Sequence, residues 1–234
     1  MDKTTHPVQL IHRYLNELEQ LRFKALSARQ SLVESYNYDI VKDYRVTIFE
    51  QIDRLIIYHD TNVALFLRYI INPQYVSELF NTSVSDSKRI AIDYLQRTKH
   101  ALVIFIQSVV ESFYRAVCNQ LQIKVPFSFA KLVDSMFDYF NFDKDTNWYK
   151  ANDILSKVRN TIHNNGIHTH SDESVTYQGK QHCFSKNLPH QSAGYETIIQ
   201  IIGDLVECIY SIGKESSNIK LIDNHGFVDY NKII

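Results

Sequence analysis

Glycine and proline are scarce in this chain, and their scarcity constrains the fold more than any other feature. Only six glycines and four prolines occur among 234 residues. Turns are therefore few and regular elements long, which favours helices over a sheet of many short strands. The prolines fall at the edges of periodic stretches, where they do not interrupt helical hydrogen bonding: Pro7, Pro73, Pro126 and Pro189.

Apolar residues recur every three or four positions along five stretches, which places them on one face of a helix. The corresponding helices are expected near residues 11–32, 39–71, 95–121, 148–162 and 195–212. The aromatic-rich piece 127–142 predicts a short helix with turns, and two β-prone runs around Gln178-Gly179 predict a β-hairpin over residues 174–184. The predicted fold class is all-α: a helical bundle of about five main helices with one small β-hairpin insert.

A polar, loop-like segment near residues 72–86 divides the pattern into two parts. We expect an N-terminal helical hairpin over residues 1–85 and a helical bundle over residues 86–234. The last helix carries a second apolar row, formed by Ile199, Val206 and Tyr210. Its wide apolar face needs two neighbours, either two helices of the same chain or a second subunit.

The overall composition limits the classes of partner. The net charge is −1, so no global basic field attracts nucleic acid, and any RNA site needs local positive charge or charge assembled between subunits. Three cysteines far apart in the sequence, Cys118, Cys183 and Cys208, predict free thiols in a reducing compartment. The longest unbroken apolar run, residues 101–106, is far short of a membrane span. We therefore expect a cytoplasmic protein without membrane contact.

One segment, residues 159–166, combines residue types that suit phosphodiester chemistry. Arg159 and His163 are four residues apart, so on a helix they share one face at the rim of the apolar stripe. His163 lies in the last helical turn, and an unperturbed histidine titrates near neutrality with a pKa of about 6.5. An arginine can hold a phosphate bidentately while a histidine moves protons at the 2′-hydroxyl or the leaving oxygen. Asn164-Asn165-Gly166 is typical of a helix stop.

The run Val158-Arg159-Asn160-Thr161-Ile162-His163-Asn164-Asn165-Gly166 resembles the arginine–polar–histidine motif of the HEPN superfamily. The resemblance implies an all-α bundle, frequent dimers, and a metal-independent endoribonuclease of a toxin, phage-defence or RNA-processing system. It implies Arg159 as the phosphate clamp, His163 as the proton-transfer residue and Asn160 as the polar residue that commonly follows the arginine. Asn164, Asn165 and His168 are further candidate binding residues.

HEPN-like domains often place an acidic residue on an earlier helix, where it orients the motif arginine. Glu111 is our candidate for this role. We predict a contact between its carboxylate and the Arg159 guanidinium of about 4 Å or less. The alternative is an ordinary pair of Glu111 with Arg115, which lies four residues later on the same expected helix.

Two other functions remain open at this point. The superfamily also contains inactive, binding-only members. Three residues separate Arg159 from His163, whereas four to six are usual in the family. This short spacing and the near-neutral net charge favour an inactive HEPN-like RNA-binding or protein-interaction module. The second alternative is a plain helical interaction protein in which the N-terminal hairpin supplies the interface to a protein partner. We expect a homodimer because the last helix has a wide apolar face and because the resemblance implies dimers.

Histidines offer a competing constellation that begins in the motif and continues into the polar region after it. They are His163, His168, His170, His182 and His190, with Cys183 beside one of them. A zinc site could use two of these imidazoles on one strand face, closed by a third histidine or the cysteine. No Cys-x-x-Cys or His-Glu-x-x-His spacing occurs, and loop histidines are usually solvated, so we predict no metal and no cofactor. The sequence also lacks a glycine-rich phosphate loop and a Gly-x-Ser-x-Gly elbow.

Overall fold

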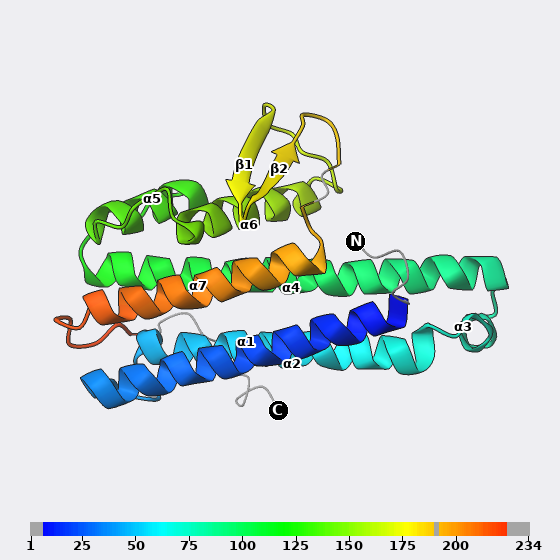
Figure 1. Cartoon of the computed structure of the whole chain (residues 1–234), viewed down its shortest axis with the longest axis horizontal. Helices are drawn as coiled ribbons and strands as arrows, with labels where there is room; N and C mark the ends of the chain where they lie inside the picture. Colours follow the sequence, from blue (N-terminus) through cyan, green and yellow to red (C-terminus); the bar gives the residue numbers. More distant parts are fainter. Residues whose placement is uncertain (1–6, 190–191, 224–234) are drawn as a thin grey trace.

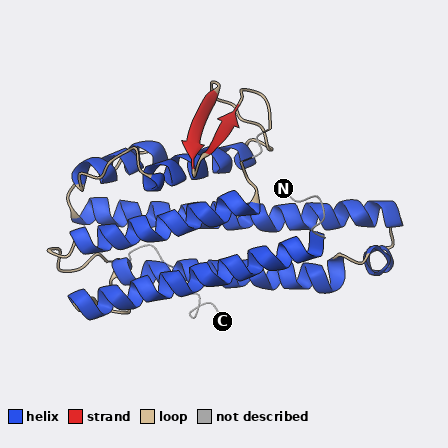
Figure 2. Ribbon diagram, viewed as in Figure 1, coloured by secondary structure: helices blue, strands red, loops and turns tan. Residues whose placement is uncertain are grey.

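The computed structural model describes residues 7–189 and 192–223 as a bundle of helices with one small β-hairpin (Figures 1 and 2). The elements are α1 (Pro7–Tyr36), α2 (Tyr44–Leu65), a π-helical turn η1 (Phe66–Ile70), α3 (Pro73–Phe80), α4 (Val84–Gln120), α5 (Phe129–Tyr139), α6 (Asn147–His163), β1 (Glu173–Tyr177), β2 (Lys180–Phe184) and α7 (Tyr195–Glu215). The predicted all-α class with a small β-hairpin is confirmed.

Helix α4, with 37 residues, extends along the whole bundle (Figure 1). The hairpin of α1 and α2 packs against α7 and α4, while α6 packs on α4 and α7 and is flanked by α5. Most of the buried apolar residues of these helices belong to one hydrophobic cluster. Among the described helices, α4 alone is long and apolar enough to cross a membrane, and half of its most apolar stretch is buried inside this bundle.

The wide apolar face of helix α7 is covered by other helices of the same chain. It packs against α1, α2, α4 and α6 of the same chain. Both apolar rows are therefore largely covered, with Ile199 and Val206 buried and Tyr210 half-buried. The wide apolar face was expected to pack against either helices of the same chain or a second subunit. In the structure, helices of the same chain cover it. The homodimer stays a prediction, but this face no longer argues for it.

The structure differs from the expected pattern around Pro73, which begins α3 rather than ending the second helix. Proline suits the first helical turn because its missing N–H has no intrahelical acceptor there. The side chain of Asn72 caps this end by accepting a hydrogen bond from the backbone N–H of Gln74, at 3.1 Å. Asn81, with φ 48°, ends α3 in the left-handed region. A short helix thus fills the segment that was expected to be a boundary.

The β-hairpin is formed where it was expected. Strands β1 and β2 pair antiparallel with Tyr177 opposite Lys180. The two turn residues, Gln178 and Gly179, have φ of 49° and 72°, and two positive φ values are the signature of the turn that matches the twist of paired strands. The hydroxyl of Tyr177 donates to Asp204 Oδ2 on α7 at 2.6 Å, which fastens the hairpin to the bundle.

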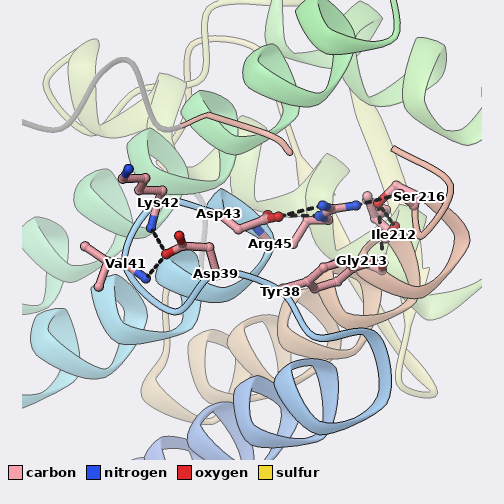
Figure 3. A network of polar contacts seen from close by, with 9 residues as sticks. All are labelled: Tyr38, Asp39, Val41, Lys42, Asp43, Arg45, Ile212, Gly213 and Ser216. Atoms are coloured by element: carbon pink, nitrogen blue, oxygen red, sulfur yellow. Dashed lines mark hydrogen bonds and ion pairs between the residues drawn. The ribbon is translucent and has the colours of Figure 1, made fainter. Parts of the chain in front are cut away.

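A buried ion pair lies at the start of α2, and its arginine also links this helix to the end of α7 through a hydrogen bond (Figure 3). The guanidinium of Arg45, fully buried, donates to both carboxylate oxygens of Asp43 at 2.9 and 2.5 Å and to the carbonyl of Ser216 at 2.6 Å. The ring of Tyr38 lies 3.7 Å from the guanidinium carbon, and its hydroxyl donates to the carbonyl of Gly213 at 2.7 Å. Nothing in the sequence pattern had indicated this network.

Candidate functional site

The candidate site lies at the C-terminal end of α6. The helix ends at His163, and Asn164 follows as its C-cap. Asn165 and Gly166 then take φ of 56° and 85°, and the N–H of Gly166 donates back to the carbonyl of Thr161 at 2.8 Å. This is a left-handed helix stop of the kind that the Asn-Asn-Gly sequence predicted, and it places His163 in the last helical turn.

Arg159 and His163 share one side of α6, next to the buried Val158. Arg159 is half-buried and His163 is exposed. The Nη1 atom of Arg159 donates a hydrogen bond to Asn160 Oδ1 at 3.3 Å. Within residues 7–189 and 192–223, no carboxylate forms an ion pair with Arg159. The site therefore carries a cation that the described part of the chain does not neutralise.

The predicted contact between Glu111 and Arg159 is wrong. Glu111 Oε1 instead accepts hydrogen bonds from Nε and Nη2 of Arg115, at 3.0 and 2.7 Å. The remaining donors of Arg115 reach the carbonyls of Pro126 and Phe127, each at 3.0 Å. A partner four residues away on the same helix is always within reach, and here the pair also fastens α4 to the loop that leads into α5.

The other candidate binding residues have different surroundings. Asn164 Nδ2 donates to the hydroxyl of Thr169 at 3.2 Å, and Asn165 is exposed in the helix stop. His168 is only 2% exposed, and its Nε2 lies 3.0 Å from the carbonyl of Ser171. These contacts favour a structural role for His168 in the loop between α6 and the hairpin.

No three histidine, cysteine, aspartate or glutamate side chains in the described part of the chain are grouped so that they could hold a metal ion. The rings of His168 and His170 lie 5.8 Å apart, but His182 is buried against Tyr177, at 6.0 Å between ring centroids, and Cys183 is exposed. His190 lies outside the described residues. All three cysteines are free, as predicted.

A buried polar cluster that nothing in the sequence pattern indicated lies where α2, α4 and the start of α7 meet. The ring centroids of His59 and Tyr195 are 5.6 Å apart, and Lys99 Nζ lies 5.8 Å from the Tyr195 ring. Neither ring nitrogen of His59, nor Asp60 Oδ1, nor the Tyr195 hydroxyl has a hydrogen-bond partner among the described residues. No spacing in the sequence links these positions, because only the packing of three helices brings them together.

Burial governs the ionisation of this cluster. It lowers the pKa of His59 to about 4, although the nearby backbone of Thr98 acts in the opposite direction. Burial also raises the pKa of Asp60 to about 6, against the nearby Arg22. Both groups are thus shifted toward their neutral forms, as desolvation requires.

Replacing His59 with leucine should flatten the pH dependence of stability. The folded pKa of His59 lies below its unfolded value of about 6.5, so its contribution is complete above that pH and is lost as the pH falls toward 4. Between pH 7 and pH 5 the native protein should lose about 2 kcal/mol of unfolding free energy more than the variant. Urea denaturation at both pH values measures this difference, and Asp60, present in both proteins, cancels. The exposed His12, changed to leucine, is the control, and an equal loss in all three proteins would contradict the assignment.

Comparisons of the chain with protein-family models, with curated proteins and with solved structures found no match. The function is therefore inferred from the surroundings of Arg159 and His163 and from the resemblance of their motif.

Proposed function

We propose that the chain is a cytoplasmic HEPN-like RNA-binding protein in which Arg159 holds a backbone phosphate. The observation that carries the proposal is the half-buried guanidinium of Arg159, which forms no ion pair with a carboxylate in the described part of the chain. A partly buried cation without a counter-charge is unfavourable, and a phosphate supplied from outside offsets that cost. Guanidinium and phosphate also match in geometry, since two parallel hydrogen bonds can form between them.

The contacts of Glu111 favour binding over cleavage. In the active form of the motif an acid orients the arginine, whereas Glu111 pairs with Arg115. His163 is exposed on the same side of α6, so it can donate a second hydrogen bond to the phosphate or to the 2′-hydroxyl. The two side chains together form a small anion-binding surface at the end of the helix.

The proposal is tested by measuring the affinity for a labelled single-stranded RNA oligonucleotide by fluorescence anisotropy in the presence of EDTA. Arg159→Ala should weaken binding about 10- to 100-fold, because a hydrogen bond to a charged group contributes about 1.5–3 kcal/mol. Arg54→Ala is the matched control, since Arg54 is exposed on α2 and has no ion pair among the described residues. Equal affinities for the native protein and Arg159→Ala would contradict the proposal.

Cleavage is the second candidate, and the exposure of His163 favours it. A solvent-accessible histidine four residues from Arg159 can act as a general base at the 2′-hydroxyl. The same RNA, incubated with the native protein in EDTA and run on a denaturing gel, separates the two functions. If the RNA stays intact, the result supports binding without cleavage. If the RNA is cleaved without metal and the cleavage disappears in His163→Ala, the protein is instead an endoribonuclease of the toxin or defence type.

A further inference from the structure

Phe127 is the most exposed large apolar side chain in the described part of the chain, at 99%. It lies in the loop between α4 and α5, directly before Ser128, the N-cap residue of α5. Phe129 and Phe137, in the same aromatic-rich segment, are buried. A phenylalanine ring fully in water adds nothing to the core, whereas a ligand that covers the ring removes a large apolar surface from water.

The backbone around Phe127 is held in place. Arg115 donates from Nη1 to the carbonyl of Pro126 and from Nη2 to the carbonyl of Phe127, each at 3.0 Å. Glu111 pairs with the same guanidinium, and Ser128 fixes the start of α5 as its N-cap. The ring is therefore presented on an ordered backbone, so a ligand that stacks on it has little of the protein to order.

A hollow of about 620 Å³ lies beside the ring, and its volume is in the range of small-molecule sites. Phe127 lines it together with Lys124 and Lys131. Both lysines are exposed, and neither forms an ion pair with another described residue. Within the described residues, the lining contains no acidic side chain. The acids of the segment 111–138 all have cationic partners elsewhere, and they are Glu111, Asp134 and Asp138. The hollow is therefore cationic, with an aromatic wall.

The hollow and Arg159 lie on the same side of α6. The hydroxyl of Tyr114 donates to Asn152 Oδ1 on α6 at 3.2 Å. The ring of Tyr114 is stacked on Phe129, the first residue of α5, with centroids 6.3 Å apart. The start of α5 thus lies beside Asn152. Arg159 follows Asn152 by seven residues, so it projects from the same side of the helix, about 10 Å farther along the axis. A strand held at Arg159 can therefore reach the hollow within a few nucleotides.

The shape and the charge of the hollow favour a nucleotide over a membrane surface. Attachment to anionic lipids takes a cluster of about four to eight cations, whereas two lysines line a concave site here. Proteins that bind single strands combine an aromatic ring, on which a base stacks, with cations that contact the neighbouring phosphates. Phe127, Lys124 and Lys131 supply these groups.

We propose that the hollow beside Phe127 binds an unpaired nucleotide of the RNA strand whose phosphate Arg159 holds. The base stacks on Phe127, and Lys124 and Lys131 contact the adjacent phosphates. This inference rests on the proposed RNA binding and adds that the protein selects single-stranded over paired RNA. In a duplex each base is already paired and stacked, so the ring has no free base to cover.

The affinities for a single strand of about ten nucleotides and for the duplex of the same sequence give the first test. The native protein should bind the single strand more tightly. Phe127→Ala should weaken single-strand binding about 5- to 150-fold and leave duplex binding unchanged. Phe127→Trp should retain the native affinity, because an indole ring also stacks. Phe23→Ala on α1 is the matched control, since Phe23 is 56% exposed and lies outside the hollow.

The salt dependence of single-strand binding tests the two lysines. Lys124→Gln combined with Lys131→Gln should reduce the slope of log affinity against log salt concentration by about 1.4, because each phosphate contact contributes about 0.7. Lys42→Gln combined with Lys88→Gln is the control, since both of these lysines are exposed and lie outside the hollow. An unchanged slope in the Lys124/Lys131 variant would contradict the phosphate contacts.

The pattern of losses separates this inference from the binding assigned to Arg159. RNA binding that needs Arg159 but is unchanged in Phe127→Ala would overturn the nucleotide site and leave the proposed function standing. RNA binding that needs Phe127 but is unchanged in Arg159→Ala would support the nucleotide site and overturn the phosphate role of Arg159. Equal affinity for single strand and duplex, or binding to phosphatidylserine vesicles that depends on Phe127, would overturn the inference. A native protein that binds neither RNA would overturn both.

Discussion

Replacing Arg45 with methionine should lower the free energy of unfolding by about 3–5 kcal/mol, the range for breaking one partner out of a buried ion pair. Asp43 is 1% exposed, so the substitution leaves its carboxylate buried, and among the described residues the backbone N–H of Arg45, at 3.0 Å, is the donor that remains. It also removes the hydrogen bond to Ser216 and the contact with the Tyr38 ring. Urea denaturation monitored by circular dichroism measures the loss.

Two controls distinguish a buried ion pair from a general effect of losing charge. Arg89→Met removes a cation from an exposed pair with Asp86 and should cost no more than about 1 kcal/mol. The double variant Asp43→Asn with Arg45→Met should be more stable than Arg45→Met alone, because it no longer buries an unpaired carboxylate. A cost below about 1 kcal/mol for Arg45→Met would show that the network does not secure the end of α7.

The long helices could be predicted from the sequence because each buries a regular stripe. The buried residues of helix α7 recur at steps of three and four positions. The hairpin turn could be predicted from the Gln178-Gly179 pair alone. Helix α3 followed neither rule. It has eight residues and only Val76 buried, so its apolar side chains mark a surface rather than a core. Hydrophobic periodicity does not distinguish such a helix from a loop.

The candidate site was predictable only as far as it lies on one helix. Arg159, Asn160 and His163 are close in sequence, and helical geometry alone places them. The partner of Glu111 depends on how α4 and α6 pack, which the sequence pattern does not specify. Glu111 pairs with Arg115 because both lie on the same helix, and Arg115 also donates to the carbonyls of Pro126 and Phe127. The Arg45 network was missed for the same reason, since Ser216 is 171 residues away in the chain.

Leu32 and Gly213 should show the second large effect on stability. Leu32, on α1, is fully buried, and truncation of such a side chain to alanine costs about 2–5 kcal/mol through lost burial and the cavity left behind. Leu32 fits because Gly213 has no side chain. A Cβ atom at Gly213 would lie 2.8 Å from Leu32 Cδ1, closer than packed carbon atoms approach. Between α1 and α7, the Leu32 side chain therefore occupies the space that a Cβ atom at position 213 would need.

A double-mutant cycle tests this coupling by a change of sign. In the native background Gly213→Ala should destabilise, since overpacking of about 1–3 kcal/mol exceeds the gain of up to about 1 kcal/mol from helix propensity. In the Leu32→Ala background the clash is absent, so Gly213→Ala should stabilise the protein. The stabilisation comes from the gain in helix propensity and from partial filling of the cavity that Leu32→Ala leaves. Gly203→Ala is the control: its nearest neighbour, Cδ2 of the half-buried Leu21, lies at 3.3 Å and can shift. If Gly213→Ala has the same effect in both backgrounds, the close approach of α1 and α7 does not depend on the missing side chain.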